Sequence, residues 1–104
     1  MSELTVFVKL HCKPGKKKEV LKLIEEKCKP YMDASDAYDI YFQSSGYEDD
    51  NEIQIFEYFA NDSEYWENCK ADWFLNYTKE LDTLLDGPKE TFRAIPFWSK
   101  GVST

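Results

Sequence analysis

Apolar side chains recur at steps of three or four between residues 61 and 85, which predicts a helix. Asn61 can accept a backbone N–H bond at its start, and Glu64 stands three residues later, as in a capping box. Asp72 prefers helix caps to helix interiors, so the segment can also fold as two helical pieces. One face holds the stripe Trp66, Cys69, Trp73, Tyr77, Leu81 and Leu84. Such a face can close a core, and it can also wall a pocket.

A second helix is predicted over residues 16–29, where an apolar stripe faces lysines and glutamates. Pro30 would remove a helical hydrogen bond, so this helix is expected to end or kink near it. Alternation of apolar and polar residues predicts four strands, over residues 4–10, 37–43, 52–59 and 90–98. Pro96 is expected at the end or the edge of the last strand.

The order β-α-β-β-α-β predicts an α+β fold of the ferredoxin-like plan, with a four-stranded antiparallel sheet and both helices on one face. The 104 residues suit a single domain with a core over about residues 4–97. The other face of the sheet is expected to carry Phe7, Tyr41, Phe56, Tyr58 and Phe92. Because so much apolar surface is costly in water, a second sheet is expected to cover it, which predicts a homodimer.

Charge is divided unevenly along the chain. Residues 1–30 carry a net charge of +4, whereas the whole chain carries −7. The acidic remainder argues against nucleic acid as a partner, since phosphate binding needs a cationic face. The basic cluster Lys13, Lys16, Lys17 and Lys18 is either a solvated helix start or, less commonly, an anion site.

The three cysteines, Cys12, Cys28 and Cys69, are widely spaced and include no CxxC pair. The single histidine, His11, cannot complete a zinc set with them, so no metal site is expected. Free thiols are typical of a reducing compartment, which predicts a cytoplasmic location. The N-terminus has no long apolar run, so neither a signal peptide nor a membrane span is expected.

At the level of pattern, residues 4–97 resemble the antibiotic biosynthesis monooxygenase family of dimeric α/β barrels. The resemblance rests on order and spacing. Its landmarks are the turn Lys13-Pro14-Gly15-Lys16, the strand start Tyr38-Asp39-Ile40-Tyr41, Glu57-Tyr58-Phe59 at a Glu-x-Trp position, Trp73-Phe74, and the exit Leu84-Leu85-Asp86-Gly87-Pro88. The resemblance implies a dimeric barrel, and oxidation of phenols or quinols without metal, flavin or haem.

The chain departs from the family where many members have histidines, since those positions hold Asn68 and Trp73. The haem-degrading branch is also similar, but its Asn, Trp and His fall on Val8, Asn68 and Thr78. None of these three residues matches, so haem degradation is not expected. No cofactor is predicted.

Three residues are candidates for catalysis. Asn68 lies off the centre of its stripe, where it can bind a substrate oxygen or simply face solvent. Glu57 alternates with Ile55 and Phe59, and a carboxyl group on an apolar face is either paired or raised in pKa. His11 carries the only imidazole, the side chain used most often as a general base, but strand alternation directs it away from the helices or to the strand's end.

Substrate-binding candidates are the aromatic residues of the stripe, for which core packing is the alternative. These aromatic residues are Trp66, Trp73 and Tyr77. Val8 is a further candidate, because it stands at the haem branch's asparagine position. The predicted function is a cofactor-independent monooxygenase acting on a small aromatic or quinol-like substrate. A non-catalytic binder or sensor and a purely structural dimer module on the same scaffold are the alternatives.

Overall fold

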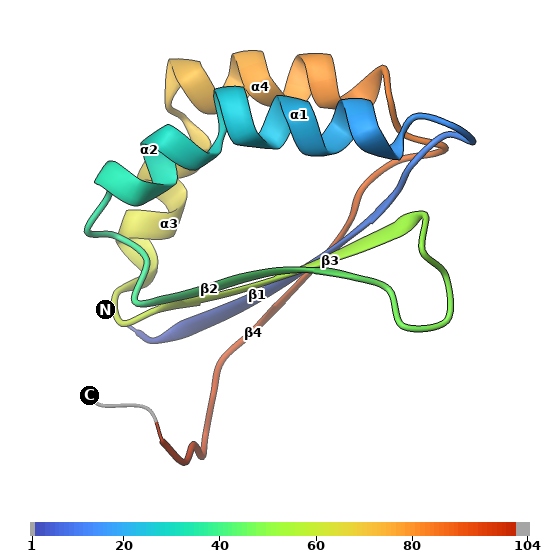
Figure 1. Cartoon of the computed structure of the whole chain (residues 1–104). Helices are drawn as coiled ribbons and strands as arrows, with labels where there is room; N and C mark the ends of the chain where they lie inside the picture. The colour runs from blue at the N-terminus through green and yellow to red at the C-terminus, as the bar shows by residue number, and fades with distance from the viewer. Residues whose placement is uncertain (1, 102–104) are drawn as a thin grey trace.

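The computed structural model describes residues 2–101, and within this range the chain forms four strands and four helices. One antiparallel sheet has the strand order β2-β3-β1-β4. Its strands are β1 (Leu4–His11), β2 (Ile40–Ser45), β3 (Glu52–Phe59) and β4 (Glu90–Ala94). The helices α1 (Lys17–Lys27), α2 (Lys29–Ala34), α3 (Asp62–Cys69) and α4 (Asp72–Asp82) lie on one side of the sheet (Figure 1). This arrangement confirms the predicted ferredoxin-like α+β fold.

Strand register assigns each side chain to one face of the sheet. On the face toward the helices, one row crosses all four strands with Tyr41, Glu57, Val6 and Arg93 directly opposite one another. The next row, on the face away from the helices, is Phe42, Phe56, Phe7 and Phe92. The outward prediction for Tyr41 was therefore wrong. Tyr41 pairs with buried Glu57, and Phe42 takes the outer position.

Both helical segments are interrupted where the sequence indicated. Pro30 falls in the first turn of α2, where its missing N–H leaves no helical acceptor unsatisfied. Asn61 caps α3 by accepting a hydrogen bond from the Ser63 backbone N–H. Two residues, Lys70 and Ala71, separate α3 from α4.

The interruption between α3 and α4 corrects the predicted stripe. A continuous helix would bury Trp66, but Trp66 is 46% exposed and Tyr65 is only 8% exposed. The helical phase restarts at α4, so α3 turns Tyr65 rather than Trp66 toward the sheet. Tyr77 and Leu81 of α4 are buried as the stripe predicted.

Two strand boundaries also differ from the prediction. β2 begins at Ile40, so the preceding residues approach the sheet as a loop. β4 ends at Ala94, two residues before Pro96, which cannot donate a hydrogen bond to a sheet. The chain then leaves the sheet as an arm, residues 95–101, on the side away from the helices (Figure 1).

The core between sheet and helices has two parts. One packs α1 and α4 on Leu10, Ile53 and Ile55, and the other gathers Leu4, Val6, Phe59 and Tyr65. Val8 contacts both parts. Within the described residues, no helix is long and apolar enough to span a membrane.

Candidate functional site

A carboxyl group lies inside the core, on the helix side of β3. Glu57 is 9% exposed and pairs with Val6 on one side and Tyr41 on the other. Burial raises the pKa of Glu57 from 4.5 to about 7, and a hydrogen bond with Tyr38 opposes that rise. Glu57 can therefore accept or release a proton near neutral pH, as a general base or acid requires.

Tyr38 connects this carboxyl group to α3. Its ring packs on Phe59, with centroids 4.7 Å apart, and meets Tyr41 edge-on at 5.4 Å. Its hydroxyl accepts a hydrogen bond from the Asn68 side-chain amide. The structure therefore joins two predicted catalytic residues, Asn68 and Glu57, through a tyrosine. Strand alternation continued back from outward-facing Phe42 would turn Tyr38 outward as well, but β2 begins only at Ile40, and Tyr38 in the preceding loop turns inward.

Phenol and thiol groups surround the rest of Glu57. The Cys28 thiol forms hydrogen bonds with the hydroxyls of Tyr41 and Tyr77. Burial raises the pKa of Cys28 to about 11, and it also raises the pKa values of Tyr38, Tyr41 and Tyr77. These groups therefore keep their protons at neutral pH, and Glu57 is the member of this cluster that titrates there.

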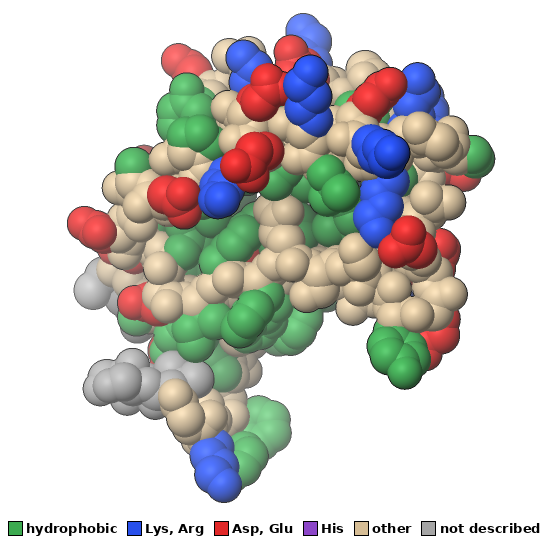
Figure 2. Space-filling model, in the orientation of Figure 1, with side chains coloured by type: hydrophobic (Ala, Val, Ile, Leu, Met, Phe, Trp, Pro, Cys, Tyr) green, Lys and Arg blue, Asp and Glu red, His purple; other side chains and the backbone are tan. Residues whose placement is uncertain are grey.

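A cavity of about 430 Å³ opens between α1, α2 and β2, next to this cluster. Figure 2 shows the face on which it opens, where hydrophobic side chains line a hollow beneath the charged helices. Gln43 donates a 2.8 Å hydrogen bond to the Tyr41 hydroxyl. Tyr41 therefore belongs both to the cavity wall and to the row that contains Glu57. The wall is formed by Leu21, Ile24, Cys28, Met32, Tyr41 and Gln43 together with the charged residues Glu25, Lys29 and Asp33.

The predicted aromatic residues occupy separate places. Trp73 stacks on Tyr31 with ring centroids 4.6 Å apart, and buried Tyr77 lies beside them at a smaller cavity of about 170 Å³. Trp66 lies on the surface of α3, where the Arg93 guanidinium sits 5.4 Å from its ring centre. Of these, Tyr77 contacts the cluster around Glu57, through Cys28.

His11 is not part of this arrangement. It lies at the end of β1 on the face away from the helices, whereas Glu57 faces them. Its Nε2 is 2.8 Å from Glu90 Oε2, and its Nδ1 is 3.9 Å from Glu52 Oε2. The structure thus separates His11 from Asn68 and Glu57. Val8 faces the helix side but serves as core packing between the two hydrophobic clusters.

No protein-family model matches the sequence, and no curated protein does either. Solved structures, in contrast, match over nearly the whole chain. Rv0793 from Mycobacterium tuberculosis has a TM-score of 0.83 at 19% identity, covering 97% of this chain and 100% of its own. A candidate antibiotic biosynthesis monooxygenase from Caulobacter crescentus has a TM-score of 0.84 at 12% identity, covering 93% and 92%. A further structure, named antibiotic biosynthesis monooxygenase, has a TM-score of 0.77 at 16% identity, covering 89% and 99%.

The chain shares the fold of these structures, two of which are named as antibiotic biosynthesis monooxygenases. This agrees with the family resemblance of the sequence. Identities of 12–19% support the shared fold and leave the reaction to be argued from the residues around Glu57.

Proposed function

We propose that this protein is a cofactor-independent monooxygenase for a small aromatic or quinol-like substrate. The observation that carries the proposal is Glu57, a buried carboxyl group with a pKa of about 7 beside a cavity with a largely apolar wall. A cavity of about 430 Å³ falls in the range of small-molecule sites. Its walls offer aromatic and aliphatic contacts, and Tyr41, Gln43 and Cys28 provide polar groups for a substrate hydroxyl.

The chemistry requires one proton acceptor. In the proposed reaction, a phenolic substrate loses its hydroxyl proton toward the Glu57 carboxylate, and apolar walls keep water from the anion. The phenolate passes one electron to O₂, and the two radicals combine as a peroxide at a ring carbon that carries hydrogen. Loss of water from that carbon leaves a quinone, so one oxygen atom enters the product and the other leaves as water. The substrate supplies all the electrons.

Tyr38 and Asn68 act in this proposal as positioning residues. Asn68 donates to the Tyr38 hydroxyl, which directs the hydroxyl hydrogen toward Glu57. The hydrogen bond between Tyr38 and Glu57 keeps the pKa of Glu57 from rising further, so a useful fraction of the carboxyl group is ionised at neutral pH. Glu57 thereby remains a base rather than a permanently protonated acid.

Oxygen uptake tests the proposal. The rates of oxygen uptake by the wild type and by Glu57→Gln are measured with a panel of quinols and polyphenols, at pH values on both sides of 7. We expect uptake by the wild type and a loss of about 100-fold or more in Glu57→Gln, the usual contribution of a general base. Glu64→Gln makes the same chemical change at an exposed position on α3 and is expected to retain activity. Background uptake by the wild type with every substrate would reject the proposal.

One observation favours a second function, small-molecule binding without turnover. Tyr41 and Cys28 stand on the cavity wall, whereas Glu57 lies behind Tyr41 in the sheet. A ligand held at the wall without reaching Glu57 would be bound and not oxidised. Thermal stabilisation by a quinol without oxygen uptake would select this function, whereas turnover would exclude it.

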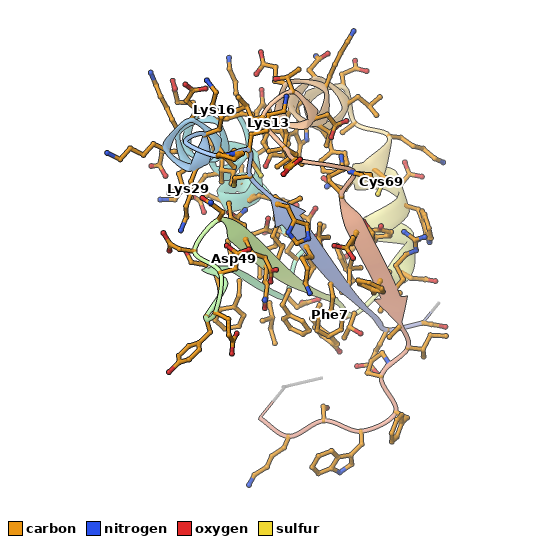
Figure 3. All side chains as sticks on the ribbon, turned by 90° about the vertical axis from the view of Figure 1, so that its right-hand side faces the viewer. Phe7, Lys13, Lys16, Lys29, Asp49 and Cys69 are labelled. Carbon is orange, nitrogen blue, oxygen red and sulfur yellow. The ribbon has the colours of Figure 1, made fainter. Side chains whose placement is uncertain are left out.

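We also propose that two copies pair through their sheets, in the cytoplasm, where the free thiols Cys12, Cys28 and Cys69 would stay reduced. The phenylalanine row lies on the face away from the helices, and Figure 3 shows Phe7 on that side of β1. The arm adds Phe97 and Trp98, which are 100% and 78% exposed. Together the exposed aromatic residues present about 700 Å² per copy, close to the roughly 800 Å² per partner of a stable interface.

A further inference from the structure

The chain's only histidine lies in a polar cluster that the proposed reaction does not use. His11 ends β1, Asp49 belongs to the loop between β2 and β3, and Glu52 begins β3. One ligand atom from each lies within 4.8 Å of the other two. Figure 3 shows Asp49 on that loop, beside the end of the sheet. We infer that His11, Asp49 and Glu52 form a binding site for a divalent transition-metal ion such as Mn²⁺ or Zn²⁺.

The orientation of the imidazole ring supports this site. A carboxylate can only accept a hydrogen bond, so in the neutral ring the Nε2–H donates to Glu90 Oε2 at 2.8 Å. The lone pair then lies on Nδ1, which faces Glu52 Oε2 at 3.9 Å. A histidine whose second nitrogen is held by a carboxylate is the common arrangement at protein metal centres. Glu90, from β4, fills that supporting position.

The two oxygens of Glu52 have different partners. Oε1 accepts a 2.6 Å hydrogen bond from Gln54 and lies 4.0 Å from the Lys9 ammonium group. Oε2 faces His11 Nδ1 at 3.9 Å, and a ligand atom of Asp49 lies within 4.8 Å of both side chains. Metal binding requires a deprotonated Nδ1, and a cation between these three groups would be coordinated by all of them.

Distances and donor types indicate the class of ion. Ligands bound at about 2.0–2.2 Å lie about 3–4 Å apart, so closing the site moves each side chain by roughly 1 Å. Asp49 is exposed on the β2–β3 loop, where its Oδ1 also accepts a 2.9 Å hydrogen bond from the Asn51 backbone N–H. One imidazole nitrogen with two carboxylates suits Mn²⁺ or Zn²⁺ better than Mg²⁺ or Ca²⁺, which favour oxygen ligands alone.

The ion would fasten the β2–β3 loop to the sheet. Two backbone hydrogen bonds already close this loop, from Gly46 N to Glu52 O at 2.8 Å and from Glu52 N to Asp49 O at 3.0 Å. These bonds hold Asp49 and Glu52 near each other in the absence of an ion. The sequence did not reveal the site, because the three residues are up to 41 positions apart and meet only through the β1–β3 pairing.

Binding of Mn²⁺ alone to the full chain tests the inference, since Mn²⁺ avoids the thiols that attract Zn²⁺. Titration calorimetry should give a stoichiometry of one Mn²⁺ ion per chain. The decrease in the electron paramagnetic resonance signal of free Mn²⁺ on binding should give the same stoichiometry. A rise in Tm of about 5 °C is expected at an ion concentration well above Kd, with a smaller rise for Mg²⁺. Zn²⁺ should bind more tightly than Mn²⁺, following the usual order of divalent ions.

Four variants make the test specific. Asp49→Asn should abolish stoichiometric binding, and Glu90→Gln should weaken it by about 10- to 100-fold, the usual loss for a supporting carboxylate. Lys9→Met removes a competing cation beside Glu52 and should tighten binding. Asp50→Asn makes the same charge change on the same loop, but Asp50 pairs with Lys17 at 2.8 Å and should leave binding unchanged.

Three results would overturn the inference. The first is no stoichiometric binding of Mn²⁺ or Zn²⁺ by the wild type. The second is equal weakening by Asp49→Asn and Asp50→Asn, which would indicate only diffuse attraction to an acidic loop. The third is Zn²⁺ binding that survives Asp49→Asn and disappears when the thiols are alkylated. The outcome is independent of oxygen uptake, because the site lies on the opposite face of the sheet from Glu57.

Discussion

The Asn68 side-chain amide on α3 donates a hydrogen bond to the hydroxyl of Tyr38, just ahead of β2. The two residues are 30 positions apart in the chain. Tyr38 in turn bonds to Glu57 on β3, so the contact connects the helix layer with a buried carboxyl group.

Tyr38→Phe removes the hydrogen bond that stabilises the Glu57 carboxylate. The pKa of Glu57 should rise above about 7, because burial is then less opposed. The pH at which activity falls on the acid side should move upward, as measured by oxygen uptake across a pH series. Tyr47→Phe, at a 97% exposed position, is the matched control and should leave the profile in place. If the pH dependence of oxygen uptake is the same in Tyr38→Phe as in the wild type, Tyr38 has no influence on the catalytic base.

Glu57 should also make folding stability depend on pH. Its pKa is about 7 when folded and near 4.5 when unfolded, so the folded state binds the proton more tightly. The stability contributed by protonated Glu57 is complete below about pH 4.5 and is lost as pH rises to about 7. The loss amounts to about 3 kcal/mol. Urea unfolding at several pH values should show this fall in the wild type and a flatter curve for Glu57→Gln.

Tyr65 and Trp66 should differ in what they contribute to stability. Tyr65 is buried against Phe59, with ring centroids 5.3 Å apart, so Tyr65→Ala should cost about 3 kcal/mol. Trp66 is half exposed, and the Arg93 guanidinium packs over its ring in a cation–π contact. Trp66→Ala should therefore lower the free energy of unfolding by only about 1 kcal/mol. Urea denaturation of the two variants gives the comparison. The reverse order would favour the continuous helix that the sequence pattern also allowed.

Asn61→Ala should weaken the start of α3. The Asn61 side chain accepts the Ser63 backbone N–H at 3.1 Å, and alanine leaves that donor without this acceptor. A loss of about 1 kcal/mol is typical for such a cap. The change in the urea midpoint measures it, and Asn61→Ser, which preserves a capping oxygen, should recover most of the loss. Equal stability of the alanine and serine variants would contradict a capping role.

The phenylalanine row should determine the oligomeric state. Phe7→Glu places a charge in the middle of the row, opposite both Phe56 and Phe92, and should convert a dimer to a monomer. Light scattering after size-exclusion chromatography measures the change. Tyr47→Glu introduces the same charge on the β2–β3 loop and should remain dimeric. A monomeric wild type at micromolar concentration would remove the proposed pairing of sheets.

Much of the fold was predictable because its causes are local. The alternation over residues 52–59 predicted the full length of β3 and placed Glu57 on its buried face. Pro30 and Asp72 marked the interruptions between helices, since each residue disfavours a helix interior at the scale of a single turn. The sequence singled out Asn68 beside an aromatic stripe and Glu57 within an apolar face, and the structure places Tyr38 between them.

The remaining features depended on contacts between distant segments. Alternation cannot show where β2 begins, and that start decides that Tyr38 turns inward toward Glu57. Nor can it show that His11 meets Glu90, 79 positions away, on the opposite face from Glu57. Sequence periodicity determined which face of each element is apolar, because that property repeats with the backbone. Tertiary structure decided which polar groups meet, because strand register and helix packing fix distances that the chain order leaves open.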